Sequence, residues 1–216
     1  MDRPAVVIIG ASGGIGSYLM SDLKEYETIG TYNTQNPFHS DWGAVYRERR
    51  DGQEPQMHQL DVLQTNRVRE FADMILPSKV VLVYATGISR DGMAHNLFLG
   101  DWDEVIDTNL RGAFVLSQAF LPRMREEGWG RIINLCSIVG QRGVPGTSAY
   151  AASKAGLEGL TRVLAAENAK KGVTVNALAL GYFNVGMINT IPHGVSEKIK
   201  AAIPMGHFGH PRNVAA

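Results

Sequence analysis

The chain has 216 residues, of which 44% are hydrophobic and 19% charged, with 24 glycines. This balance is typical of an ordinary globular domain and excludes a disordered or collagen-like chain. The formal net charge of +0 and a pI near 7.0 give no reason to expect binding to nucleic acid or to an anionic membrane surface.

The single cysteine, Cys136, excludes an internal disulfide and a cysteine-rich zinc site. His207 and His210 lie close together but among apolar residues, so we expect no metal there. No apolar run approaches the ~18–20 residues that cross a bilayer. The apolar start of the chain runs directly into a glycine turn, unlike a signal peptide. We therefore expect a cytoplasmic protein.

Short apolar runs alternate with longer amphipathic ones, which is the pattern of βαβ units around a parallel sheet. The expected strands are Ala5–Gly10, Thr28–Tyr32, Gln56–Leu60, Lys79–Tyr84, Arg131–Leu135 and Val173–Leu178. The expected helices are Gly14–Glu25, Thr65–Ile75, Asp101–Glu127 and Ser148–Lys171.

The polar stretch Asn33–Gln53 carries the weakest signal, and we assign its basic cluster of Arg47, Arg49 and Arg50 to a solvated helix face. No repeat or linker divides the chain. The sequence therefore predicts one α/β domain over residues 1–216, a doubly wound parallel sheet with helices on both faces.

A glycine-rich turn, GASGGIG at residues 10–16, joins the first expected strand to the first expected helix. Glycines there allow a tight turn, close approach of a pyrophosphate and close packing of helix on strand. The helix N-terminus adds free N–H groups and a partial positive charge. A plain strand-to-helix turn would also explain the glycines, so the turn alone indicates a dinucleotide site only weakly.

Tyr150 and Lys154 stand four residues apart near the start of an expected helix, so both side chains can enter one pocket. A free tyrosine ionises near pH ~10. A nearby cation stabilises the phenolate and lowers that pKa, towards the range where acid–base transfer is efficient. Taken alone, such a pair is usually an exposed helix face.

Ser137 follows an apolar strand, and a hydroxyl at the carboxyl end of a parallel strand faces the crevice where ligands bind. A loop serine that caps a turn is the ordinary alternative. Asn109 falls within the expected helix Asp101–Glu127, where an asparagine ordinarily faces water.

The combination of motifs is more specific than any one of them. GASGGIG, the serine after IINLC, YAASK and VNALALG, in this order and spacing, resemble the short-chain dehydrogenase/reductase family. Within that family the chain is most similar to 3-oxoacyl-(acyl-carrier-protein) reductases and acetoacetyl-CoA reductases. The similarity covers nearly the whole chain, including GISRDGM and DTNLRGAF. It implies a Rossmann-like fold and a nicotinamide-dependent oxidoreductase.

The resemblance also implies roles for four residues. Tyr150 would be the general acid in reduction and the base in oxidation. Lys154 would lower the pKa of Tyr150 and hold the nicotinamide ribose. Ser137 would hydrogen-bond the substrate carbonyl as it becomes an alkoxide. Asn109 would steady a water linked to the lysine.

The cofactor contacts that the motifs and the resemblance imply lie in the turn and after the strands. They are Gly10, Ser12, Gly14, Ile15, Gly16, Thr31, Asn33, Asp61, Val62, Ala85, Gly87, Tyr150, Lys154 and Gly181. Asp61 matches the aspartate that contacts the adenine amino group, although a carboxylate that simply ends a strand is the alternative.

The second strand predicts which dinucleotide is bound. An NAD enzyme is expected to have an Asp or Glu at the end of this strand, which binds the ribose 2′-hydroxyl. The end of the strand here, GTYNT at residues 30–34, contains no acidic residue. Thr31, Asn33 and Thr34 could instead donate to a 2′-phosphate. Gly13 occupies a position where many NADP-binding members carry arginine, which argues the other way. We expect NADP(H) rather than NAD(H).

The chain departs from the family pattern in three places. Tyr84-Ala85-Thr86-Gly87 replaces Asn-Asn-Ala-Gly after the fourth strand. Val185 replaces the threonine that often contacts the nicotinamide amide. The sequence ends at Ala216 where relatives continue, so we expect that the last helix and strand of the family are missing from it.

The leading hypothesis is NADPH-dependent reduction of a 3-oxoacyl thioester, carried on acyl carrier protein or on CoA. Arg131 and Lys171 resemble basic positions that dock the acidic carrier. Alternatives are an alcohol or hydroxysteroid dehydrogenase and a non-catalytic dinucleotide-binding sensor. Substrate choice should depend on the segments Gly140–Thr147 and Gly181–Met205. Pairing of the two long helices with those of a second copy should give a homodimer or homotetramer.

Overall fold

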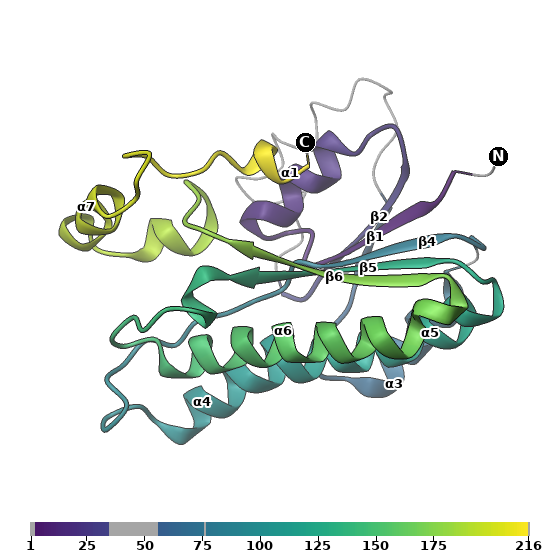
Figure 1. Cartoon of the computed structure of the whole chain (residues 1–216), viewed down its shortest axis with the longest axis horizontal. Helices are drawn as coiled ribbons and strands as arrows, with labels where there is room; N and C mark the ends of the chain where they lie inside the picture. Colours follow the sequence, from purple (N-terminus) through teal and green to yellow (C-terminus); the bar gives the residue numbers. More distant parts are fainter. Residues whose placement is uncertain (1–2, 35–55, 76, 216) are drawn as a thin grey trace.

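A parallel sheet forms the centre of the computed structural model, which describes residues 3–34, 56–75 and 77–215 (Figure 1). Among these residues the strand order is β3-β2-β1-β4-β5-β6. The strands are β1 (Ala5–Ile9), β2 (Glu27–Tyr32), β3 (Gln56–Gln59), β4 (Val80–Tyr84), β5 (Gly130–Ser137) and β6 (Val173–Leu180). The order reverses direction between β1 and β4, and in open α/β sheets ligands bind at such a switch point, outside the carboxyl ends of the strands.

Strand β1 is buried on both faces, because all five residues from Ala5 to Ile9 are at most 4% exposed. Val7 and Ile9 belong to the core on one face, whereas Val6 and Ile8 belong to the core on the other. This double covering explains why the strand is a continuous apolar run without polar alternation.

Helices cover both faces of the sheet, which confirms the doubly wound α/β fold (Figure 1). Helix α1 (Gly14–Asp22) lies on one face, and the short η6 (Pro211–Val214) packs against it. The opposite face is covered by α3 (Thr65–Met74), α4 (Leu99–Ile106), α5 (Gly112–Glu126) and α6 (Ser148–Asn168). Beyond the carboxyl ends of β5 and β6 lie η5 (Gly186–Thr190) and α7 (His193–Ala201). No helix in the described ranges is both long and apolar enough to span a membrane.

Two differences from the expected elements affect the site. The long helix expected over 101–127 is interrupted by a π-helical turn, η2 (Asp107–Arg111), in which the Gly112 N–H donates to the Asp107 carbonyl five residues earlier. Strand β5 continues two residues beyond its expected end, so Ser137 is its last residue and not part of the following loop.

Other expected boundaries were less accurate. The first helix ends at Asp22, and α6 ends at Asn168, where a 3₁₀ turn, η4 (Ala169–Lys171), takes over. Strand β6 extends to Leu180. The basic cluster of Arg47, Arg49 and Arg50 lies outside the described residues.

Candidate active site

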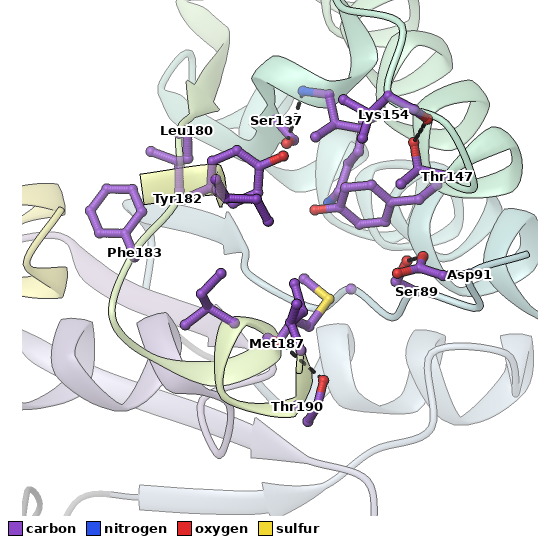
Figure 2. A pocket seen from close by; sticks show the side chains of 18 of the residues that line it. Ser89, Asp91, Ser137, Thr147, Lys154, Leu180, Tyr182, Phe183, Met187 and Thr190 are labelled. Carbon is purple, nitrogen blue, oxygen red and sulfur yellow. Dashed lines mark hydrogen bonds between the residues drawn. The ribbon is translucent and has the colours of Figure 1, made fainter. Parts of the chain in front are cut away.

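A cavity of about 500 Å³ lies at the carboxyl edge of the sheet (Figure 2). Its walls come from the ends of β4, β5 and β6, the start of α6, and the segment that leads into α7. Three of the four predicted catalytic residues line it: Ser137, Tyr150 and Lys154. The predicted cofactor contacts Ile15, Ala85, Gly87 and Gly181 line the same cavity.

Tyr150 is the third residue of α6, and its phenol is half-buried in the cavity wall. Burial raises its pKa above the ordinary value, and a hydrogen bond with Ser137 opposes that rise. The phenol therefore holds its proton at neutral pH, as a proton donor must.

Lys154 follows Tyr150 by one helical turn and is 4% exposed. Its Nζ donates to the Leu135 carbonyl over 2.8 Å and lies 5.7 Å from the centroid of the Tyr150 ring. Burial lowers the pKa of Lys154 to about 8. Desolvation is the largest influence on the pKa of Tyr150 and raises it, and the expected lowering by Lys154 stays a prediction.

Ser137 places its side chain at the carboxyl end of β5, where it is 7% exposed. Its Oγ accepts a hydrogen bond from the Val139 N–H over 3.2 Å, so it does cap a turn. The hydroxyl also lines the cavity. The turn-capping reading and the catalytic one are thus compatible, since the Val139 contact uses a lone pair and leaves the hydroxyl proton available.

Asn109 lies in the π turn η2 and is 0% exposed, contrary to the expectation that a mid-helix asparagine faces water. Its Oδ1 accepts from the Ile88 N–H over 2.8 Å, and its Nδ2 donates to the Ile88 carbonyl and to Ser153 Oγ over 2.9 and 3.0 Å. Both side-chain donors are occupied. Any water beside Asn109 is therefore not held by its amide N–H groups.

The glycine-rich turn has the shape that a pyrophosphate requires. Gly10 has a φ of +82°, which favours glycine. Gly14 is required for a different reason, because a Cβ there would stand 2.8 Å from the Gly186 N of the segment that packs on the turn. No side chain caps the N-terminus of α1 at Gly13, so its first N–H groups are open to a phosphate. Ser12 is half-buried in this turn. These residues fit a dinucleotide.

Thr31 is not open to a 2′-phosphate, contrary to the sequence-based expectation. It is 1% exposed, and its Oγ1 accepts from the Gly10 N–H over 3.1 Å. Its carbonyl also accepts from the Ala11 N–H over 2.8 Å. Thr31 therefore supports the turn from below, while Asn33 and Thr34 are exposed at the end of β2.

Asp61 and Val62 follow β3, as predicted for the adenine side. One Asp61 oxygen accepts from the Leu63 N–H over 2.9 Å, which is the local strand-ending role that was the alternative. The half-buried carboxylate keeps further acceptor capacity. Val62 is 6% exposed and faces the π turn, where a Cβ on Gly112 would lie 2.8 Å from its Cγ2.

The sequence reasoning did not single out several residues that line the cavity, among them Tyr182, Ser89 and Asp91. Figure 2 shows the Tyr182 phenol entering the pocket from the end of β6, with Ser89 and Asp91 across from it. Burial raises the pKa of Tyr182, and the nearby Arg142 guanidinium opposes that rise. The available signal was an aromatic residue two positions after the carboxyl end of a parallel strand.

Gly16 gives a direct test of the turn. A Cβ at this position would collide with the Gly10 carbonyl oxygen and Ala11 Cα. We expect Gly16→Ala to weaken dinucleotide binding at least about tenfold, because the phosphate-facing N–H groups are displaced. Fluorescence titration with NADPH measures this.

Gly159→Ala is the matched control, because a Cβ there would meet only Arg162 Nη2, at 3.8 Å. It should leave binding unchanged. Equal affinities for Gly16→Ala and the unmodified protein would contradict the assignment of the turn.

Comparisons with known proteins agree with this geometry. The family described as short chain dehydrogenase matches residues 4–195. An acetoacetyl-CoA reductase from Rhizobium meliloti is 46% identical over 136 residues, which are 62% of this chain and 56% of that protein. A 3-oxoacyl-[acyl-carrier-protein] reductase from Staphylococcus epidermidis is 35% identical over 218 residues, which are 100% of this chain and 89% of that protein.

A solved structure is also similar over nearly the whole chain. A Beutenbergia cavernae protein assigned as an NAD(P)-dependent gluconate 5-dehydrogenase, with bound NADP, superposes with a TM-score of 0.86 at 31% identity. The match covers 98% of this chain and 86% of that one. By the family match, the full-length similarity and the shared fold, the chain belongs to the short-chain dehydrogenase family of oxidoreductases.

Proposed function

We propose that the protein reduces the ketone of a 3-oxoacyl thioester with NADPH. One observation carries the proposal: two phenols, Tyr150 and Tyr182, and the Ser137 hydroxyl line a single cavity. A 3-oxoacyl thioester has two carbonyl oxygens separated by three carbons. Tyr150 and Ser137 would bind the ketone oxygen, and Tyr182 would donate to the thioester oxygen.

The chain's own residues supply the proton and the charge stabilisation. When bound, the dinucleotide supplies the hydride. Ser137 donates to the ketone oxygen as negative charge develops on it. Tyr150, whose pKa is raised by burial, transfers its proton to that oxygen. Lys154 places a cation 5.7 Å from the Tyr150 ring centroid and favours the resulting phenolate.

NADPH is proposed over NADH because the end of β2 has no acid. Asn33 and Thr34 are the exposed residues there, and both can donate to a 2′-phosphate. A carboxylate at this position would bind the 2′-hydroxyl of NADH and repel that phosphate. The bound NADP in the Beutenbergia cavernae protein agrees with this choice.

A dehydrogenase of a polyhydroxylated acid is the second candidate. Asp91 and Ser89 line the cavity, and a carboxylate there can accept hydrogen bonds from substrate hydroxyls. The similar protein assigned as a gluconate 5-dehydrogenase favours this alternative. A non-catalytic sensor would not need the tyrosine, lysine and serine that line this cavity.

CoA is proposed as the thioester carrier. Arg131 is engaged away from the cavity, with its Nη1 donating to the Gly130 and Gly172 carbonyls and its guanidinium 4.5 Å from the Trp129 ring centroid. Arg131 is the second residue of β5 and Ser137 is the last, a separation of about 20 Å along the strand. Lys171, beside Gly172, lies at the same end, so this basic pair does not border the chain's own cavity.

Pairing through the long helices remains part of the proposal. Phe114 on α5 is 44% exposed and Val163 on α6 is 55% exposed. Such apolar side chains on adjacent helices suit burial against a second copy in a homodimer or homotetramer.

The experiment that tests the function follows NADPH oxidation with acetoacetyl-CoA, an acetoacetyl carrier protein and 5-keto-gluconate in parallel. We expect turnover with acetoacetyl-CoA at a kcat/KM at least about tenfold above that with the keto acid. Preference for 5-keto-gluconate would establish the second candidate. A higher kcat/KM with the acetoacetyl carrier protein than with acetoacetyl-CoA would show that the thioester is carried on the protein and not on CoA.

Tyr182→Phe should separate a 1,3-dicarbonyl substrate from a simple ketone. We expect kcat/KM for acetoacetyl-CoA to fall about tenfold, the cost of one lost hydrogen bond of ~1.4 kcal/mol. The rate with cyclohexanone, which has no second carbonyl, should be unchanged. An equal loss of kcat/KM with both substrates would show that Tyr182 does not bind the thioester oxygen.

A further inference from the structure

Tyr84 is the largest fully buried side chain and ends the central strand β4 at 1% exposure. It does not line the cavity. Its Oη donates a hydrogen bond to the Thr108 carbonyl in the π turn η2. Burial raises the pKa of Tyr84 far above its ordinary value, so the phenol is a permanent donor. The family pattern has asparagine at this position, so this phenol is a departure of the present chain.

Gly112 shows that the π turn and the phenol are fitted to one another. A Cβ on Gly112 would stand 2.6 Å from Tyr84 Oη and 2.8 Å from Val62 Cγ2. The Gly112 N–H also makes the five-residue hydrogen bond to Asp107 that defines the turn. The glycine therefore leaves space for the hydroxyl at the place where the helix changes its register.

Asn109 extends the contact from Tyr84 towards the catalytic helix. It follows Thr108 and binds both backbone groups of Ile88, the residue after the cavity residue Gly87. Its Nδ2 also donates to Ser153 Oγ, which in turn donates to the Tyr150 carbonyl over 2.7 Å. Hydrogen bonds on either side of the Thr108–Asn109 peptide thus join the end of β4, the π turn and the first turn of α6.

We propose that Tyr84 is a positioning residue that holds the π turn in the register that places Asn109 between the Gly87–Ile88 segment and α6. A π turn contains one more residue than the corresponding α-helical turn. Relaxation to α register would rotate the following residues by about 100° around the helix axis. Asn109 would then lose its hydrogen bonds to Ile88 and to Ser153 together. The Gly87–Ile88 segment and the start of α6, which both border the cavity, would no longer be held by the same residue.

Tyr84→Phe tests this inference because it removes only the hydroxyl. With the carbonyl substrate that the unmodified protein reduces best, we expect kcat to fall about tenfold, since small misplacements near reacting groups are costly. KM and the dissociation constant for NADPH should change less than twofold. Hydrogen exchange at the Ile88 amide, measured by NMR without substrate, should become at least about tenfold faster. The Ala85 amide, bonded to Ile9 within the sheet, is the internal reference.

Ser117→Ala is the matched control for loss of a buried hydroxyl. Ser117 is 1% exposed and its Oγ donates to the Ala113 carbonyl within α5, outside the path to the cavity. It should lower the melting temperature as much as Tyr84→Phe does, yet leave kcat and Ile88 exchange unchanged. Equal effects of the two variants on kcat would overturn the proposal and leave Tyr84 a structural residue.

A double-mutant cycle with Asn109→Ala shows whether Tyr84 acts through Asn109. If it does, Tyr84→Phe has no further effect on kcat once Asn109 is alanine. Additive losses in the double variant would overturn the inference, as would unchanged Ile88 exchange in Tyr84→Phe. The inference rests on the family's carbonyl–alcohol chemistry and not on the thioester, so a different substrate preference leaves these outcomes intact.

Discussion

Tyr150→Phe is expected to reduce turnover by about 10²–10⁴-fold, the range that a positioned general acid contributes. The phenol is the group in the cavity whose proton is retained by burial at neutral pH and which also hydrogen-bonds Ser137. Phenylalanine keeps the ring, so the cavity wall should remain. Steady-state NADPH oxidation measures the loss, and a fluorescence titration should give an NADPH dissociation constant within about twofold of the unmodified value.

Tyr26→Phe is the control for removing a tyrosine hydroxyl elsewhere, because Tyr26 is 39% exposed and lies after α1, away from the cavity. It should keep full activity. If Tyr150→Phe keeps more than about a tenth of the turnover, the proton comes from another donor. Tyr182, the second phenol in the cavity, would then be the group to replace.

The raised pKa of Tyr150 also fixes the direction of the pH dependence. Because the acid form is needed for reduction, the reduction rate should stay level through neutral pH and fall only in alkaline solution. Oxidation of the alcohol needs the phenolate and should instead rise with pH. A reduction rate that already falls below pH 7 would contradict Tyr150 as the proton donor.

The order of the elements was predictable because strands such as β1 and β4 are continuous apolar runs. The residues of Ala5–Ile9 are all apolar, so the sequence itself indicates that this strand is buried. The π turn was not predictable from the local sequence, and its contact with Tyr84 joins residues that are 24 positions apart in the chain. The burial of Asn109 likewise depends on Ile88 and Ser153, which lie on other elements.

In the candidate site, too, some features were predictable from the sequence and others depend on tertiary contacts. The motifs located Ser137, Tyr150 and Lys154, and the fold brings all three to one cavity. The sequence did not predict that burial would raise the pKa of Tyr150 and lower that of Lys154, because burial is a tertiary property. It assigned substrate choice to two segments, one of which contains Tyr182, but could not single out this residue, because the side chains that enter the cavity depend on how the chain folds after β6.

Lys154→Met is expected to lower turnover by about 10²–10³-fold and, at the same time, to stabilise the fold at neutral pH. Methionine has a similar length but no charge, so the Tyr150 phenolate loses its cation. The buried ammonium destabilises the folded state, which is why burial lowers the pKa of Lys154 to about 8. Removing it should raise the free energy of unfolding at pH 7 by about 1–3 kcal/mol, after allowance for the lost bond to the Leu135 carbonyl.

The pH dependence of that stability gives the sharper test. Above pH 8 the folded lysine releases its proton, whereas the unfolded one keeps it to about 10.5, so the unfolded chain binds more protons in this window. The free energy of unfolding of the unmodified protein should therefore rise between pH 8 and ~10. Lys154→Met should lose this rise, and the exposed Lys170→Met should retain it. Denaturant unfolding at several pH values measures both, and a parallel rise in Lys154→Met would show that the ammonium is not the titrating group. If Lys154→Met loses the rise, stability and catalysis oppose each other at this position, because the buried cation that favours the phenolate also weakens the fold.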